Sequence, residues 1–266
     1  MNKKVLVVID MQNDFITGVL GNPDRIRVVD EVVKLIENGN YDEIYVTRDA
    51  HKENYLETYE GKHLPIKHCI KDTEGYEIVD KVQNALKKVH SRKKMIKYYD
   101  KIAFGSIKMT NDILRHLILD SAKQNSNINI QIDFCGVCTG ICVINNALLA
   151  RATLPEAHIR IIADACACVT YESHEMALQV MKMSHIEIVE NSQYWVSFLI
   201  QDNKDKTILC PILNSVTSIE EAKSIIEKGK KNYRVLSAWI DKYDNNNNKV
   251  NVFHECYVDT IGKINS

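Results

Sequence analysis

The stretch that decides the fold of this chain is Val5-Leu-Val-Val-Ile-Asp10-Met-Gln-Asn-Asp-Phe15. Its first five residues are apolar and mostly β-branched, which is typical of a short strand buried on both faces. The carboxylate of Asp10 follows at the C-terminal edge of that strand, where a side chain can face a cleft and where burial raises a carboxyl pKa. An aspartate here can equally cap a helix or lie in a loop, so this segment alone leaves both interpretations open.

Similar apolar runs recur along the chain and alternate with helical periodicity. Further strands are expected at Glu43–Thr47, Met95–Tyr98, Ile128–Cys135, Ile159–Ala163 and Ile186–Val189. Helices are expected near Arg25–Glu37, Thr110–Lys123, Gly140–Ala152 and Glu172–Met183. This alternation predicts an α/β fold with a mainly parallel sheet covered by helices on both faces. In such sheets functional residues gather where the strands end.

The alternation of apolar strands with helices ends after Ser192. This change predicts a main domain over residues 1–191 and a small α+β C-terminal domain over 192–266. In the second part a capping box, Ser218-Ile-Glu-Glu221, opens a helix that should stop near Gly229. Polar turns at 202–206 and 244–249 indicate hairpins. The expected strands of this ββαββ appendage are Trp195–Ile200, Thr207–Leu213, Tyr233–Ile240 and Val250–Tyr257.

The composition argues against several classes of protein. Among 266 residues the formal net charge is -1, so no electrostatic case exists for a nucleic-acid or membrane partner. No apolar segment approaches the roughly 20 residues that span a bilayer, and the first apolar run is too short for an export signal. The 8 cysteines mostly lie in apolar runs, which favours reduced thiols in a cytoplasmic protein over a secreted disulfide framework.

A second segment, Phe134-Cys-Gly-Val-Cys138-Thr-Gly-Ile-Cys142-Val143, joins an expected strand to a helix. A thiol in the first turn of a helix feels the positive end of the helix dipole, which lowers its pKa and favours a thiolate nucleophile. Backbone N–H groups in the same turn can hold an oxyanion. Cys135 and Cys138 also fit a C-x-x-C redox motif, but Cys135 lies in the strand and not in an exposed turn, which disfavours that interpretation. The remaining cysteines of apolar runs are expected to be inert packing residues: Cys135, Cys166, Cys168, Cys210 and Cys256.

A third segment, Asp100-Lys101-Ile-Ala-Phe104-Gly-Ser106, follows the expected strand Met95–Tyr98. A lysine at a strand end, beside a carboxylate and a cysteine, would stabilise a thiolate by its charge. The alternative is a solvated surface lysine, and the spacing also leaves Lys97 as a competitor.

A fourth segment contains Asp49, His51 and His68, with Glu57 and Glu60 between them. Asp and His two residues apart at a strand end, followed by Glu and a later His, have the ligand types of a catalytic Zn²⁺, Fe²⁺ or Mn²⁺ site. Loop histidines that only make hydrogen bonds are the competing interpretation.

Taken together, Asp10-Met-Gln-Asn-Asp-Phe15, Lys101-Ile-Ala-Phe104-Gly-Ser106 and Gly136-Val-Cys138-Thr-Gly-Ile-Cys142-Val resemble the isochorismatase-like cysteine hydrolases, especially nicotinamidases and related amidases. The resemblance runs from about Lys3 to Asn191 and implies a Rossmann-like three-layer sandwich.

The resemblance also implies a mechanism. Cys142 would attack an amide carbonyl, Asp10 would move the proton, and Lys101 would balance the charge of both, through a thioester intermediate. A cis peptide bond is implied at Val137–Cys138, which would aim the N–H groups of Cys138 and Cys142 at the oxyanion.

The resemblance to nicotinamidases further implies a divalent metal and no organic cofactor. Asp49, His51 and His68 match the ligand pattern, and Glu60 resembles the acidic ligand of some members, with Glu57 as the alternative. The implied substrate contacts are Phe15, Leu64, Phe104 and Val137. Leu64 departs from the tryptophan that nicotinamidases often have before the proline, which bears on the substrate more than on the reaction.

These features predict an amidohydrolase of a small-molecule amide, with nicotinamide giving nicotinate and ammonia as the leading reaction. The alternatives are another small amide, an N-carbamoyl compound or a vinyl ether, of which Cys142 disfavours the last. A thiol sensor or binding module on the same fold is the alternative from another class. A homo-oligomer is compatible with the sequence.

Overall fold

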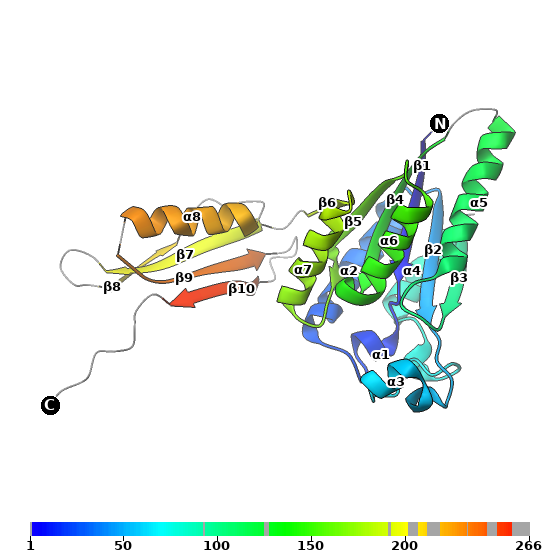
Figure 1. The fold of residues 1–266 in the computed structure, drawn as a ribbon, viewed down its shortest axis with the longest axis horizontal. Helices are drawn as coiled ribbons and strands as arrows, with labels where there is room; N and C mark the ends of the chain where they lie inside the picture. Colours follow the sequence, from blue (N-terminus) through cyan, green and yellow to red (C-terminus); the bar gives the residue numbers. More distant parts are fainter. Residues whose placement is uncertain are drawn as a thin grey trace. The chain divides into compact units, whose positions relative to one another are not determined.

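The computed structural model describes residues 2–92, 94–124, 128–190, 193–201, 207–211, 219–232, 234–243 and 249–256. The chain divides into two compact units, residues 1–189 and 190–266 (Figure 1). No helix within the described residues is long and apolar enough to cross a bilayer.

The first unit is built on one six-stranded sheet whose neighbouring strands are all parallel. The strand order is β3-β2-β1-β4-β5-β6, which is the order of Rossmann-type sheets. The central strand β1 is fully buried over Val5–Ile9, as its apolar sequence requires. The strands are β1 (Asn2–Ile9), β2 (Glu43–Asp49), β3 (Met95–Lys101), β4 (Asn129–Val137), β5 (His158–Ala167) and β6 (Glu187–Val189).

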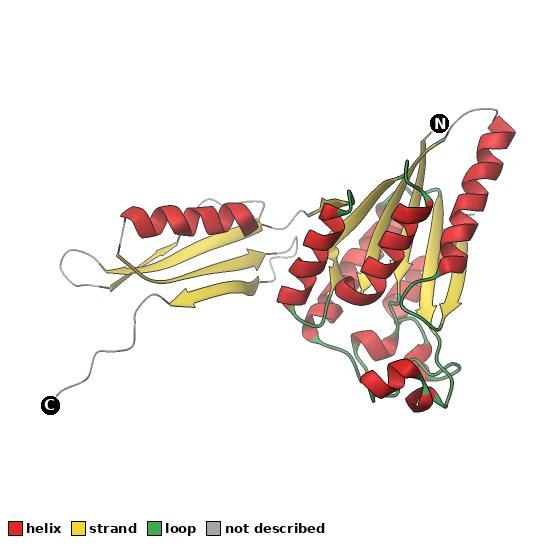
Figure 2. Cartoon of the chain, viewed as in Figure 1, coloured by secondary structure: helices red, strands yellow, loops and turns green. Residues whose placement is uncertain are grey.

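Helices cover both faces of this sheet, which completes the three layers expected from the sequence (Figure 2). Helices α2 (Pro23–Asn38) and α4 (Asp80–His90) pack against each other on one face. Helices α5 (Ile107–Gln124), α6 (Ile144–Thr153) and α7 (Tyr171–Met183) cover the other. The α/β fold class is therefore confirmed.

The sheet reverses its strand order between β1 and β4, and such a switch leaves a crevice at the carboxyl ends of the strands. Gly136 at the end of β4 pairs with Ile9 and has φ +114. A Cβ at this glycine would lie 2.1 Å from the Ile9 carbonyl oxygen, so only glycine permits this approach of the two strands.

Some local predictions for the first unit need revision. The helix expected from Gly140 begins as a π-helical turn, η3 (Thr139–Val143), and becomes α-helical only at Ile144. Helix α4 was not predicted, although Val82, Ala85, Leu86 and Val89 are buried at helical spacing. The other unpredicted elements are the short helices α1 (Asn13–Ile16), η1 (Tyr55–Glu57), α3 (Tyr59–His63) and η2 (Glu74–Tyr76).

The second unit is a four-stranded antiparallel sheet of order β10-β9-β7-β8 with one helix. Its elements in chain order are β7 (Gln193–Gln201), β8 (Thr207–Pro211), α8 (Ile219–Asn232), β9 (Arg234–Tyr243) and β10 (Lys249–Cys256). The expected capping residue Ser218, the polar turns at 202–206 and 244–248, and Leu213, Tyr233 and Tyr257 lie outside the described residues.

Helix α8 continues past Gly229, where the sequence predicted its end. The physical reason is the ring of Phe198, because a Cβ at Gly229 would lie 2.8 Å from Phe198 Cζ. The glycine makes room for an aromatic side chain and does not terminate the helix.

Candidate active site and metal centre

Three polar side chains from three strand ends meet inside the first unit: Asp10 after β1, Lys101 at the end of β3, and Cys142 in the turn after β4. Lys101 Nζ lies 2.7 Å from Asp10 Oδ2 and donates a hydrogen bond to Cys142 Sγ at 3.6 Å. All three residues are buried, with Asp10 fully inaccessible. Thr47 Oγ1 donates to the other Asp10 oxygen, Oδ1, at 2.7 Å. The lysine beside the thiol is therefore Lys101, whereas Lys97 Nζ hydrogen-bonds His116 Nε2 at 2.8 Å.

Burial dominates the proton affinities of this group. It raises the pKa of Asp10, and although Lys101 and Thr47 oppose this effect, the pKa stays above its usual range, as the sequence suggested. Burial and the neighbouring Asp10 raise the pKa of Cys142 well above that of a free thiol, and Lys101 only partly offsets them. These shifts favour a neutral thiol over the thiolate that the helix dipole predicts, because burial outweighs the field of the turn. The raised pKa of Asp10 makes its carboxylate a stronger base toward the neighbouring Cys142 thiol.

A second cluster adjoins this group, made of Asp49 at the end of β2, His51, Glu60 on α3, and His68. One ligand atom from each residue lies within 4.8 Å of the other three. His51 Nε2 is 3.1 Å from Asp49 Oδ2, and His68 Nε2 is 3.8 Å from both Asp49 Oδ2 and Glu60 Oε1. Ligand atoms about 2.1 Å from a shared ion lie about 3–4 Å apart, which matches this spacing.

The chemistry of these donors fits a divalent transition metal. His68 Nδ1 donates to the Ile66 carbonyl at 2.8 Å, which fixes the tautomer whose Nε2 is free to bind an ion. Burial, followed by the charge of Asp49, raises the pKa of Glu60. A cation between the two carboxylates would relieve that repulsion, and two imidazole nitrogens with two carboxylate oxygens suit Zn²⁺, Fe²⁺ or Mn²⁺.

The acidic member of the cluster is Glu60. Glu57 is exposed and lies outside the group of converging atoms. Asp49 links the two clusters, because its Oδ1 lies 3.4 Å from Lys101 Nζ while its Oδ2 faces the histidines. A metal bound here would therefore lie one carboxylate away from the Asp10–Lys101–Cys142 group.

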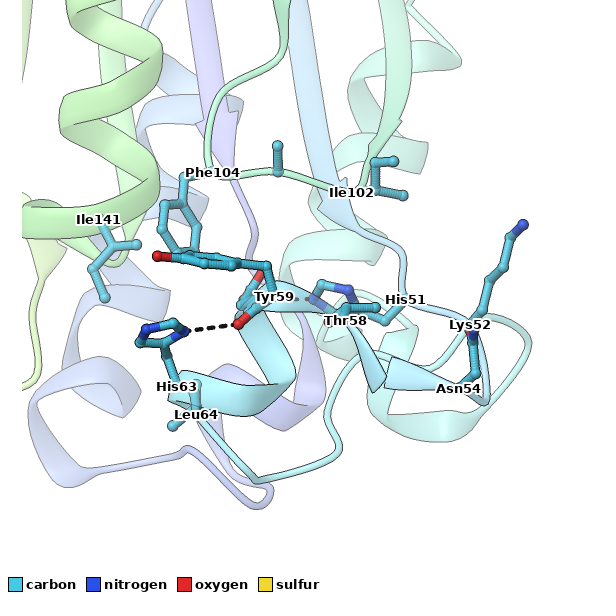
Figure 3. Close-up of a pocket in the computed structure, with 12 residues that line it drawn as sticks. His51, Lys52, Asn54, Thr58, Tyr59, His63, Leu64, Ile102, Phe104 and Ile141 are labelled. Atoms are coloured by element: carbon cyan, nitrogen blue, oxygen red, sulfur yellow. Dashed lines mark hydrogen bonds and ion pairs between the residues drawn. The ribbon is translucent and has the colours of Figure 1, made fainter. Parts of the chain in front are cut away.

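A cavity of about 900 Å³ opens over the metal cluster. His51 and Glu60 line it, and so does Ile141, the neighbour of Cys142 in sequence. Figure 3 shows Phe104, Tyr59, His63 and Leu64 on the wall of the cavity, and the ring centroids of Tyr59 and His63 lie 4.4 Å apart. The complete lining is His51, Lys52, Asn54, Thr58, Tyr59, Glu60, His63, Leu64, Ile102, Ala103, Phe104 and Ile141.

Of the four implied substrate contacts, Leu64 and Phe104 line this cavity. Phe15 and Val137 are not among its lining residues. Val137 is 1% exposed, and the Phe15 ring packs against His68 with 5.4 Å between ring centroids. Phe15 therefore supports a metal-cluster histidine from the side. The Val137–Cys138 peptide bond is cis, as the resemblance implied.

Two buried amides that the sequence analysis did not single out hold the site together. Gln12 Nε2 donates to the carbonyls of Asp49 and Tyr76, each at 2.8 Å, and its Oε1 accepts from Asp49 N at 2.7 Å. Gln12 follows Asp10 by two residues, and a polar side chain so close to a buried strand was a signal that could have identified it.

Asn146 joins the cysteine turn to the Phe104 loop. Its Nδ2 donates to the carbonyls of Cys142 at 2.8 Å and Phe104 at 3.0 Å, and its Oδ1 accepts from Ser106 N at 2.9 Å. Asn146 lies four residues after Cys142, about one helical turn further along. This spacing is the sequence feature that could have identified it.

The fold defines an α/β protein with Rossmann-like topology whose two polar clusters lie at the carboxyl ends of its parallel strands. More particularly, the chain belongs to the isochorismatase family, whose domain model matches residues 4–193. A comparison with curated protein sequences found no match.

Solved structures similar to this chain include several nicotinamidases. The nicotinamidase/pyrazinamidase PncA from Bacillus subtilis is 28% identical with a TM-score of 0.57, and the match covers 71% of this chain and 100% of that one. The pyrazinamidase of Pyrococcus horikoshii, solved in complex with zinc, is 26% identical with a TM-score of 0.54 and coverage of 70% and 98%. Yeast nicotinamidase Pnc1p, at 18% identity, shares the fold with a TM-score of 0.55 and coverage of 70% and 99%.

Proposed function

We propose that this protein is an amidohydrolase that cleaves a small-molecule amide through a thioester on Cys142, with nicotinamide as the leading substrate. The observation that carries the proposal is the position of Lys101 Nζ, 2.7 Å from a buried carboxylate and 3.6 Å from a buried thiol. The similarity to a nicotinamidase from Bacillus subtilis and a pyrazinamidase from Pyrococcus horikoshii, at 28% and 26% identity, supports the substrate class.

In the proposed reaction Asp10 takes the proton of Cys142 while the sulfur attacks the amide carbonyl carbon. The protonated Asp10 then gives this proton to the amide nitrogen, the C–N bond breaks, and ammonia leaves. Water attacks the thioester next, Asp10 accepts a water proton, and the C–S bond breaks to release the acid. The sulfur recovers its proton from Asp10, so one amide and one water give one acid and one ammonia.

Lys101 contributes a fixed positive charge to each of these steps. The pKa of Lys101 is raised well above its usual value. Burial lowers this pKa, but the charges of Asp10, Cys142 and Asp49 together raise it by more. The ammonium group therefore stays charged while the proton moves between Asp10 and Cys142. A charge held 3.6 Å from the sulfur favours the thiolate that develops during attack.

Asp49, His51, Glu60 and His68 would hold a divalent metal at the edge of the cavity. Such an ion supplies a Lewis acid that can bind a ring nitrogen of a heteroaromatic amide. The side chains of Leu64, Phe104 and Ile141 would bind the flat apolar faces of such a ring. Leu64 offers less ring contact than tryptophan, so we expect a substrate range broader than nicotinamide alone.

The test is ammonia release from a panel of amides that includes nicotinamide, pyrazinamide, aliphatic amides and N-carbamoyl compounds, with and without a chelator. Cys142→Ala should abolish turnover. Cys166→Ala is the matched control, because Cys166 is also buried and its Sγ makes a long hydrogen bond, 3.9 Å, to the Phe134 carbonyl. Turnover by a folded Cys142→Ala protein would exclude the mechanism, and absence of any ammonia release by the parent chain would exclude the function.

A further inference from the structure

Two thiols beside the proposed active site have no side-chain role in the reaction. Cys138 follows β4 and Cys168 follows β5, and their sulfur atoms lie 3.3 Å apart. The sequence offered Cys135 as the C-x-x-C partner of Cys138, but Cys135 is fully buried and its Sγ donates to the Val7 carbonyl at 3.7 Å. The structure therefore pairs Cys138 with a cysteine 30 residues away.

The hydrogen bonds around this pair are asymmetric. The Cys138 thiol donates to Cys168 Sγ, and the Gly140 N–H donates to the same sulfur at 3.3 Å. On the other side Arg25 Nη2 lies 3.5 Å from Cys138 Sγ and donates to it. Cys168 Sγ therefore accepts two of these hydrogen bonds, and Cys138 Sγ donates one and accepts one.

The proton affinities follow this asymmetry. The hydrogen bond from Cys138 lowers the pKa of Cys168 to about 5, with help from Ser173 and the Gly140 N–H against the effect of burial. The same bond, with burial, raises the pKa of Cys138. Thiolates and not thiols are the sulfur nucleophiles that react with oxidants. The lowered pKa of Cys168 and the hydrogen bonds that its sulfur accepts both favour Cys168 as the sulfur that reacts first, with Cys138 Sγ 3.3 Å away to resolve its oxidised form.

We propose that Cys138 and Cys168 form a peroxide-sensitive dithiol that closes to an intrachain disulfide. The Cys168 thiol first gives its proton to solvent. The thiolate then attacks one oxygen of hydrogen peroxide, an S–O bond forms, the O–O bond breaks, and the departing hydroxide takes a proton back from solvent to become the first water. The Cys138 sulfur then attacks the sulfenic sulfur, an S–S bond forms, the S–O bond breaks, and the second water leaves with the proton of Cys138. Two thiols and one peroxide thus give one disulfide and two waters.

Closing the disulfide requires only a small movement. A disulfide bond is about 2.05 Å long, so the sulfurs approach by about 1.2 Å from their present 3.3 Å. Each cysteine keeps a little solvent contact, at 8% exposure for Cys138 and 5% for Cys168, which is compatible with entry of an oxidant the size of water. Cys142 differs from Cys168 because it is a neutral thiol at rest. Peroxide should therefore oxidise the pair before it oxidises Cys142.

The experiment treats the full reduced chain with a small molar excess of hydrogen peroxide at neutral pH. After quenching with catalase, free thiols are alkylated under denaturing conditions and the protein is digested with trypsin. Trypsin leaves Cys135, Cys138 and Cys142 on one peptide and Cys166 and Cys168 on another, so fragment ions must assign the linked pair. We expect loss of two thiols per chain and a Cys138–Cys168 cross-link that dithiothreitol reverses, with Cys142 recovered in alkylated form.

Two matched variants sharpen the assignment. Cys168→Ser should abolish the cross-link, whereas Cys166→Ser should keep it because Cys166 has no contact with Cys138 among the hydrogen bonds of the described residues. If either variant fails to fold, the fragment ions of the parent chain still decide the outcome. The proposal is overturned if peroxide oxidises Cys142 while Cys138 and Cys168 remain alkylatable, if a different pair is linked, or if the link persists in Cys168→Ser.

Discussion

Replacing Lys101 by methionine removes the ammonium group that lies close to both Asp10 and Cys142 while keeping a side chain of similar length. Lys101 Nζ lies 2.7 Å from Asp10 Oδ2 and 3.4 Å from Asp49 Oδ1, and it is buried with them. Without it, two buried carboxylates face a sulfur with no neighbouring positive charge. The pKa values of Cys142 and Asp10 should both rise, because Lys101 opposes the upward shift of each.

The magnitude follows from the distance of 3.6 Å between Nζ and Sγ. At an effective dielectric constant of about 20, a unit charge at this distance contributes about 5 kcal/mol to a thiolate, equivalent to about 3 pKa units. Protonation of Asp10 in the variant would offset part of this effect. We therefore expect alkylation of Cys142 at neutral pH to slow by at least tenfold, and by at most about a thousandfold.

The assay is the rate at which iodoacetamide modifies Cys142, followed by mass spectrometry of its tryptic peptide. Lys97→Met is the matched control, because Lys97 is on the same strand but contacts His116. Its alkylation rate should equal that of the parent. An unchanged rate in a folded Lys101→Met protein, or an equal loss in Lys97→Met, would refute the assigned charge coupling.

Three further predictions follow from the same geometry. Thr47→Val removes a hydrogen bond that lowers the pKa of Asp10, so the acidic limb of the kcat/KM profile should move up by about one pH unit, whereas Thr47→Ser should leave it in place. His51→Ala should reduce the bound divalent metal from about one ion per chain to near zero, as measured by elemental mass spectrometry of the purified protein. His63 lines the cavity but lies outside the cluster, so His63→Ala should retain the metal. Truncation after residue 190 should leave metal binding and amide turnover in the soluble fraction. The reason is that 71% of this chain matches the Bacillus subtilis structure along 100% of its length. A folded, metal-loaded truncated protein without turnover would show that the appendage belongs to the active site.

The sheet could be predicted from the sequence because most of its parallel strands contain a short apolar, β-branched run, although β3 is more polar. The ends of the strands were less accurate: β5 was expected to stop at Ala163 but continues to Ala167. Its last residues, Asp164-Ala-Cys-Ala167, are small and partly polar. Cys166 and Ala167 are buried and pair with Gly136 and Val137 of β4, which no local pattern reveals. Strand limits therefore depend on tertiary partners more than strand existence does.

Residues of the candidate site could be predicted from the sequence only where a chemically suitable residue lies at the end of a strand. Asp10, Lys101 and Cys142 meet that condition. The three motifs that contain them occur in the order typical of the family, which predicted that these residues share one site. Lys97 and Lys101 have the same parity on β3, so alternation could not separate them, and only the strand end distinguishes Lys101.

The supporting contacts could not be predicted, because their partners come from other strands and loops. Thr47 on β2 donates to Asp10 after β1, and Asn146 on α6 joins the Cys142 turn to the Phe104 loop. The protonation state of Cys142 also could not be predicted from the sequence. A turn that favours a thiolate is visible in the residues, but complete burial, which outweighs it, is a property of the folded chain.

A resting thiol does not weaken the proposed chemistry, because proton transfer from Cys142 to Asp10 leaves the net charge of the buried group unchanged. Before transfer the group consists of a carboxylate, the ammonium of Lys101 and a thiol; after transfer it consists of a carboxylic acid, the same ammonium and a thiolate. Lys101 is close to both atoms that carry the negative charge, at 2.7 Å from Asp10 Oδ2 and 3.6 Å from Cys142 Sγ. The charge therefore moves between two positions that share one counterion, and no isolated ion is created in a region of low dielectric. This arrangement keeps the nucleophile protonated until a carbonyl carbon is present to accept the electron pair of the sulfur.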